Sequence, residues 1–144
     1  MTIWKTNVWW FYALLSAFFA ALTALLAKVG IKGVDSDLAT AVRTIVILII
    51  AWSIVLLKGG AKGIPTLSKS NVLFLCLSGV ATGLSWIFYF RALQIGKVSQ
   101  VASIDRTSLV FATILAFIFL GETISWTTAV GSALIITGAI LVVL

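Results

Sequence analysis

The sequence predicts an all-α, polytopic membrane protein with five transmembrane helices. Apolar residues make up 62% of the 144 residues and charged residues only 10%, whereas soluble proteins average roughly 25% charged residues. The apolar residues also gather in five runs of about 20 residues, the length that an α-helix needs to cross a bilayer. We therefore expect a single transmembrane domain over residues 1–144, with helices at about 8–27, 38–57, 72–90, 98–120 and 126–144.

The ends of these runs carry residues that suit helix termini. The first run contains no charge and starts with three aromatic residues, as expected at a membrane interface; these are Trp9, Trp10 and Tyr12. Asp35 or Ser36 can cap the second helix, and Thr123 or Ser125 can cap the fifth. Residues 58–69, which include the only proline, are expected to form an exposed loop.

Glycines recur at regular intervals in the third and fifth predicted helices. Gly79 and Gly83 form a G-x-x-x-G pattern, and Gly131 and Gly138 lie seven residues apart. Both spacings place the glycines on one helix face, where a second helix can approach closely. We expect these four residues to serve structural helix contacts.

Three charged residues inside the predicted spans mark the candidate site: Arg43, Asp105 and Arg106. Each charge costs at least about 2.5–3.5 kcal/mol in the membrane, so such residues usually face protein or a water-filled path. At about 1.5 Å per residue, Arg43 and Asp105 lie roughly 7 and 10 Å from the same membrane face. Trp86 and Tyr89, three residues apart on one face of the third helix, fall in the same layer.

Two interpretations of this layer stay open. Asp105 points about 100° away from Arg106 around the helix, so it needs another partner, and Arg43 is the candidate at matching depth. In the first interpretation the two form a structural ion pair, and Arg106 extends to the membrane surface. In the second, the layer faces an aqueous cavity, with Ser103 on the same polar stripe as Arg106, and Asp105 could exchange a proton during transport.

The same layer predicts which chemical groups a solute would present to it. The rings of Trp86 and Tyr89 could hold ammonium groups, while Arg43 or Arg106 could hold carboxylates. Amino acids or their breakdown products would satisfy both. The predicted substrate-binding residues are therefore Arg43, Trp86, Tyr89, Ser103, Asp105 and Arg106.

Composition excludes several other classes of function. The chain has no histidine, one cysteine (Cys76) and four carboxylates, so an internal disulfide is impossible and we expect no metal site and no cofactor. No nucleophile–base arrangement or phosphate-binding loop is present, which argues against an enzyme. The net charge of +6 comes mostly from residues at the ends of apolar runs, where they contact lipid head groups. Nucleic-acid binding is therefore not expected.

The distribution of positive charge gives almost no preferred orientation. Five spans place the termini on opposite sides of the membrane, with four basic residues on each side: Lys5, Lys58, Lys62 and Lys69 against Lys28, Lys32, Arg91 and Lys97. The positive-inside rule therefore selects neither orientation. A chain that inserts both ways would form an antiparallel homodimer, with the inverted symmetry common in transporters.

Several segments resemble the EamA domain of the drug/metabolite transporter superfamily. They are Arg43 in the second helix, FYFRALQIGKVS at 88–99, DRTSLVFATILAFIFLGE at 105–122 and GSALIITGAILVVL at 131–144. The likeness covers nearly the whole chain, which is similar to one half of a ten-helix transporter with inverted repeats, as in the short five-helix bacterial and archaeal type. The first helix has no acid, unlike the four-helix small multidrug branch.

The resemblance implies a central cavity and export of small solutes across the plasma (inner) membrane of a bacterium or archaeon. It also implies that Gly121 and Glu122 stabilise the corner between helices four and five, where a carboxylate can satisfy the free N–H groups of the last helix. We therefore expect a secondary carrier that works by alternating access. Translocation of a lipid-linked head group, and a non-transporting scaffold or accessory half, are the alternatives.

Overall fold

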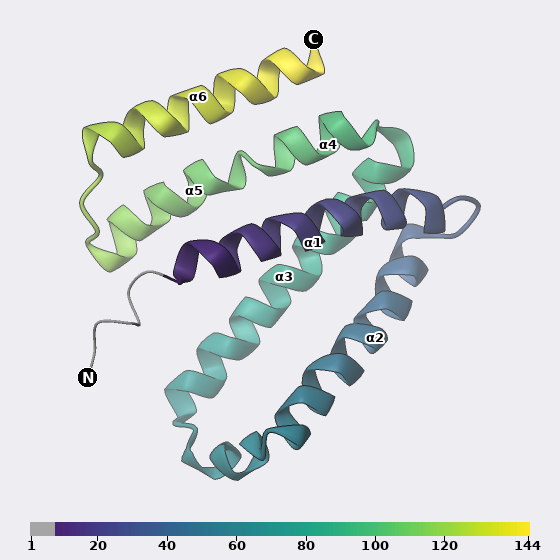
Figure 1. Ribbon diagram of the computed structural model, residues 1–144, viewed down its shortest axis with the longest axis vertical. Coiled ribbons are helices and arrows are strands. Elements are labelled where there is room, and N and C mark those ends of the chain that lie inside the picture. Colours follow the sequence, from purple (N-terminus) through teal and green to yellow (C-terminus); the bar gives the residue numbers. More distant parts are fainter. Residues whose placement is uncertain (1–7) are drawn as a thin grey trace. The chain divides into compact units, whose positions relative to one another are not determined.

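A computed structural model describes residues 8–144, and every regular element in them is helical (Figure 1). Five segments are long and apolar enough to cross a membrane, which confirms the predicted fold class. They are α1 (Trp9–Gly30), α2 (Ser36–Leu57), α3 (Lys69–Ile95), the segment Val98–Leu120 and α6 (Trp126–Val143). Lys5, counted in the orientation argument, lies outside the described residues.

The chain divides into two compact units, of which residues 30–94 form one. This unit is a pair of helices, α2 and α3, joined by the short 3₁₀ helix η1 (Gly60–Thr66). Part of the predicted loop at 58–69 is thus helical, and Gly59 starts η1 at a φ of 68°, a left-handed conformation that glycine adopts without steric cost. The segment is exposed apart from Ala61, which is half-buried.

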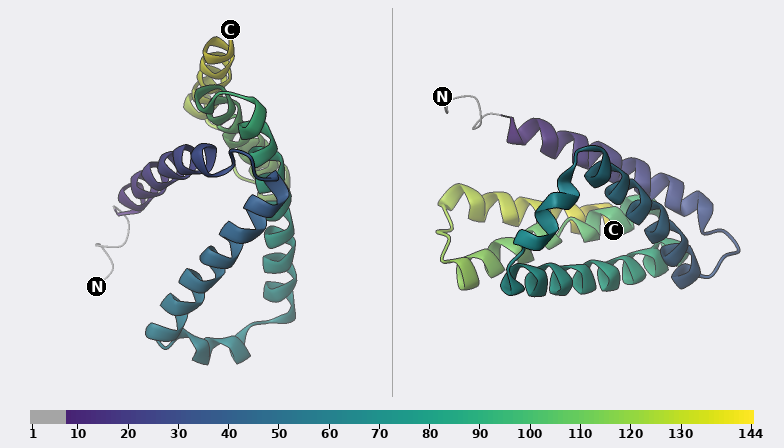
Figure 2. Two further views of the ribbon diagram at one scale, coloured as in Figure 1. Left: turned by 90° about the vertical axis from the view of Figure 1, so that its right-hand side faces the viewer. Right: turned by 90° about the horizontal axis from the view of Figure 1, so that it is seen from below.

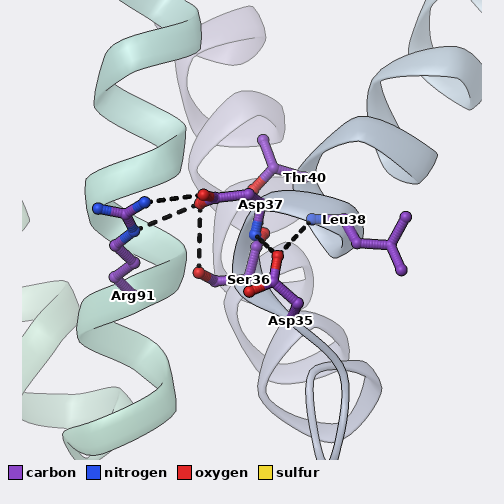
Figure 3. A network of polar contacts seen from close by, with 6 residues as sticks. All are labelled: Asp35, Ser36, Asp37, Leu38, Thr40 and Arg91. Atoms are coloured by element: carbon purple, nitrogen blue, oxygen red, sulfur yellow. Dashed lines mark hydrogen bonds and ion pairs between the residues drawn. The ribbon is translucent and has the colours of Figure 1, made fainter.

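Asp35 explains why α2 begins where it does. One oxygen of its carboxylate, Oδ1, accepts hydrogen bonds from the backbone N–H groups of Asp37 and Leu38, each at 3.0 Å. These amides belong to the first turn of the helix, where the backbone N–H groups have no acceptor within the helix. Of the two predicted caps, Asp35 is therefore the one that the structure uses (Figure 3).

The core of the 30–94 unit lies where α2 begins and α3 ends. The two helices approach each other at this end and separate toward η1 (Figures 1 and 2). Phe90 and Leu93 of α3 are 2% and 0% exposed, and Ser36 and Thr40 of α2 are also buried. The Thr40 hydroxyl donates to the Ser36 carbonyl oxygen at 2.8 Å, which removes the cost of burying an unpaired hydroxyl.

Of the described residues, 8–29 and 95–144 form the other unit. In it α6 packs along α4 (Val98–Asp105), and the side-chain amide of Gln100 donates to the Val143 carbonyl oxygen at 3.3 Å. Ala139 on α6 is buried. At the end of α1, Lys28 Nζ donates to the Gly96 carbonyl oxygen at 2.8 Å, which ties α1 to the turn before α4.

The predicted helix at 98–120 is interrupted at Arg106 and Thr107. It consists of α4, α5 (Ser108–Leu115) and a π-helical turn, η2 (Ala116–Leu120), and Figure 1 shows the break between α4 and α5. The backbone amides of Thr107 and Leu109 bond three residues back, to the carbonyl oxygens of Ile104 and Arg106, which is the tighter 3₁₀ pattern. The Thr107 hydroxyl also donates to the Ile104 carbonyl oxygen at 2.7 Å, a bond that competes with the α-helical ladder.

The corner after η2 is a turn at Gly121. Gly121 has a φ of 67°, and the backbone N–H groups of Gly121 and Glu122 both bond to the Ala116 carbonyl oxygen. This is the left-handed ending typical of helix C-termini. The cap of α6, however, is Ser125, whose hydroxyl accepts from the Thr128 amide at 3.1 Å. The Ser125 hydroxyl thus satisfies one of the free N–H groups at the start of α6, and the role of Glu122 at this corner stays a prediction.

Candidate functional site

Arg43 lies against two aromatic rings of α3. Its guanidinium carbon is 4.3 Å from the centroid of the Trp86 ring and 4.7 Å from that of Phe90, well inside the range of about 6 Å over which a cation is attracted to a ring face. Arg43 is seven residues after the first residue of α2, so it lies roughly 10 Å along the helix. The side chain is half-buried, as is that of Trp86.

These contacts follow from the spacing of residues on the two helices. Trp86 and Phe90 are four residues apart, so their side chains lie one above the other on the same face of α3. Arg43 follows the buried Thr40 by three residues, which directs both toward α3 at the end where the two helices meet. The sequence therefore places a long cationic side chain of α2 opposite a pair of rings.

Both carboxylates of the 30–94 unit have other partners. Asp37 forms an ion pair with Arg91, in which Arg91 Nη2 lies 2.7 Å from Asp37 Oδ2 and Arg91 Nε donates to Oδ1 at 3.3 Å (Figure 3). Asp35 caps α2. The two groups lie at the beginning of α2, one to two turns before Arg43. Within this unit the charge of Arg43 is thus balanced by ring faces rather than by an acid.

Tyr89 and Phe90 complete the aromatic surface around Arg43. Their ring centroids are 6.3 Å apart with the rings steeply inclined, an edge-to-face arrangement. Tyr89 was predicted for the site and Phe90 was not. Phe90 could have been identified from its spacing of four residues from Trp86, but an isolated phenylalanine in an apolar helix is indistinguishable from a core residue in the sequence.

The remaining predicted residues, Ser103, Asp105 and Arg106, lie in the other unit, at the break between α4 and α5. Ser103 is half-buried, and the side chains of Asp105 and Arg106 are exposed within the described chain. Within the 30–94 unit, Arg43, Trp86 and Tyr89 thus lie near one another, and within the other unit Ser103, Asp105 and Arg106 lie together at the break. The ion pair between Arg43 and Asp105 would join the two units, and it stays a prediction.

The four glycines at helix-contact spacing are open on the described chain. A Cβ atom added at Gly79, Gly83, Gly131 or Gly138 would have no neighbouring atom of residues 8–144 within 4 Å, apart from its own helix and chain neighbours. Within each unit these glycine faces are therefore open, and the helix contacts predicted for them stay a prediction.

The arrangement can bind charged or polar solutes but offers no set of metal ligands. In residues 8–144, no group of three or more aspartate, glutamate, histidine or cysteine side chains gathers closely enough to hold a metal ion. Arginine presents five N–H donors in a planar fork that suits carboxylates, and stacking on rings leaves those in-plane donors accessible.

The chain is similar to known transport proteins. Residues 7–144 match the EamA-like transporter family. The chain is 47% identical to an uncharacterized transporter in the cobO 3′ region of Sinorhizobium sp, over 92% of this chain and 94% of that protein. It is 33% identical to solute carrier family 35 member G1 of Mus musculus, over 92% of this chain but only 35% of that protein. None of the solved structures matches it.

The family match covers almost the entire chain, and the described residues contain five candidate membrane spans with an arginine held on aromatic rings inside one of them. The family is one of transporters rather than enzymes, as the absence of a nucleophile–base arrangement predicted. This multi-pass membrane protein belongs to the EamA-like transporter family.

Proposed function

We propose that the protein is a secondary carrier that exports small polar or amphipathic metabolites by alternating access, as an antiparallel homodimer in the plasma (inner) membrane of a bacterium. The observation that carries this proposal is Arg43, a charge roughly 10 Å along an apolar helix that rests on Trp86 and Phe90 instead of an acid of its own unit. A charge at such a position is costly and usually marks a solute or ion pathway.

The interrupted fourth span supports the same proposal. Asp105, Arg106 and Ser103 lie at a point where the α-helical hydrogen bonds give way to 3₁₀ bonds. In carriers, non-helical backbone at membrane depth is tolerated where it lines a protein interior or a water-filled cavity, and discontinuous helices often form the solute site. We propose that these three residues line the pathway together with Arg43, Trp86 and Tyr89.

The open glycine faces support assembly with a second copy. Gly79, Gly83, Gly131 and Gly138 have room for close helix contact that the described residues of their own unit do not fill. The similarity to a mouse solute carrier covers 35% of that protein, so a longer carrier contains a comparable segment. Two copies of the chain in opposite orientation would supply the inverted symmetry that alternating access uses.

Flux measurements in vesicles test the carrier proposal. Purified protein is reconstituted into phosphatidylethanolamine–phosphatidylglycerol vesicles loaded with labelled amino acids and their deaminated acids. We expect flux above that of protein-free vesicles, and we expect Asp105→Asn to abolish it while the helical circular-dichroism signal is retained. Flux of no solute, together with tight binding of one other membrane protein, would instead indicate a scaffold, and flux of labelled lipid-linked head groups alone would indicate a translocase.

Cysteine labelling tests the antiparallel dimer. Cys76 is exposed and is first replaced, as Cys76→Ser, so that single cysteines placed at either end of the chain report alone. Both ends react with an impermeant maleimide in intact cells if the chain inserts in two orientations. Labelling of one end only would refute the antiparallel arrangement.

A further inference from the structure

The ring faces near Arg43 limit the charge that a solute can carry. The faces of Trp86 and Phe90 are both within 5 Å of the Arg43 guanidinium carbon, at 4.3 and 4.7 Å. A solute ammonium group on either face would lie beside the positive charge of Arg43 and would be repelled by it. The face of Trp86 over which Arg43 lies is therefore not available to a solute ammonium group, because the guanidinium already occupies it.

The guanidinium of Arg43 retains donors that the rings cannot satisfy. Arginine has five N–H groups in the plane of the guanidinium, whereas the ring faces attract its charge. The carboxylates of the 30–94 unit are engaged elsewhere, Asp35 at the helix cap and Asp37 with Arg91. The guanidinium thus lies against two rings and has no carboxylate of its own unit to bind.

We propose that Arg43, Trp86 and Phe90, hereafter the arginine clamp, bind the carboxylate of an anionic solute and make the carrier selective for acids over amines. The rings hold the guanidinium so that its edge can form two parallel hydrogen bonds to one carboxylate, a geometry that an untethered lysine does not offer. This inference rests on the proposed carrier function, of which it names the substrate class.

The clamp is tested by the binding of three probes that share the leucine side chain and differ in net charge. N-acetylleucine is an anion, leucine a zwitterion and leucinamide a cation at neutral pH. Binding of each radiolabelled probe at millimolar concentration is measured by scintillation proximity to the protein in lipid nanodiscs, which requires no transport. We expect N-acetylleucine to bind at least about tenfold more tightly than leucinamide, the difference that one charge-assisted hydrogen bond provides.

The variants compare arginines and rings of the same chain. Arg43→Gln is expected to remove the preference for N-acetylleucine, and Arg43→Lys to recover it only in part. Arg91→Lys is the matched control on α3, because its partner Asp37 lies outside the clamp, and it is expected to leave the preference unchanged.

Phe90→Leu retains the charge but frees the guanidinium, so it is expected to raise the KM for flux with little change in kcat. Trp86→Phe keeps a ring and is expected to have the smaller effect.

Several results would overturn the clamp. These are absence of N-acetylleucine binding to folded protein, tighter binding of leucinamide, or loss of the preference in Arg106→Gln with retention in Arg43→Gln. If Arg43→Gln and Asp105→Asn each unfold the protein and the double variant refolds it, Arg43 is a structural partner of Asp105 and the proposal fails. Selective binding without any flux would contradict only the carrier function, whereas flux that is indifferent to Arg43→Gln would contradict only the clamp.

Discussion

The contact between Arg43 and Phe90 allows a quantitative prediction about how the two helices of the 30–94 unit are held together. The guanidinium carbon lies 4.7 Å from the Phe90 centroid, and the arginine is half-buried. Cation–π contacts contribute about 0.5–1 kcal/mol when exposed and about 2 kcal/mol when desolvated. Because Arg43 is only half-buried, we expect a coupling energy of about 1 kcal/mol between Arg43→Met and Phe90→Leu.

A double-mutant cycle isolates this coupling from the other effects of each substitution. Phe90 is 2% exposed, so Phe90→Leu also removes packing, and the cycle cancels that contribution. The free energy of unfolding is measured in mixed micelles by titration with a denaturing detergent, for the wild type, both single variants and the double variant. Since Arg91 is paired with Asp37, a second cycle between Arg91→Met and Phe90→Leu serves as the control and should give no coupling. Equal coupling in both cycles, or none with Arg43, would refute the contact.

Two further predictions concern the ends of helices. Asp35→Ala removes the acceptor of two backbone N–H groups and should lower the free energy of unfolding by about 0.5–2 kcal/mol. Asp35→Ser keeps a capping oxygen and should retain most of that free energy. An equal loss of stability in both variants would exclude capping by Asp35. Gly121→Ala places a side chain at a φ of 67° with no atom within 4 Å. We therefore expect only backbone strain, which should lower the free energy of unfolding by about 1–2 kcal/mol. The same substitution at Gly131, where a positive φ is absent, should lower it far less in the same detergent titration.

The five spans could be predicted because a bilayer requires a minimum apolar length, and this requirement acts on each segment by itself. The cap at Asp35 could be predicted for a related reason, since it depends on the two or three residues that follow it. The match of these local rules to the structure explains why the fold class and the EamA-like family follow from the sequence.

The break at Arg106 and Thr107 could not be predicted in the same way. No proline or glycine lies near the break. The Thr107 hydroxyl donates to the Ile104 carbonyl oxygen, which is one of two bonds that a threonine in a helix can form. The role of Phe90 was missed because it depends on where the side chain of Arg43 extends, and Arg43 is 47 positions away in the chain (90 − 43). The sequence pattern predicted Trp86 with Tyr89, and only the packing of α2 on α3 shows that Phe90 also contacts Arg43.

The most direct test of the proposed function is a comparison of solute flux between two arginine variants in the same type of vesicle. Arg43→Gln removes the charge that rests on Trp86 and Phe90, and Arg91→Gln removes the exposed arginine that pairs with Asp37. We predict that N-acetylleucine efflux is lost in Arg43→Gln and is close to wild type in Arg91→Gln, at equal amounts of folded protein. Equal efflux in the two variants would contradict the assignment of Arg43 to the solute pathway.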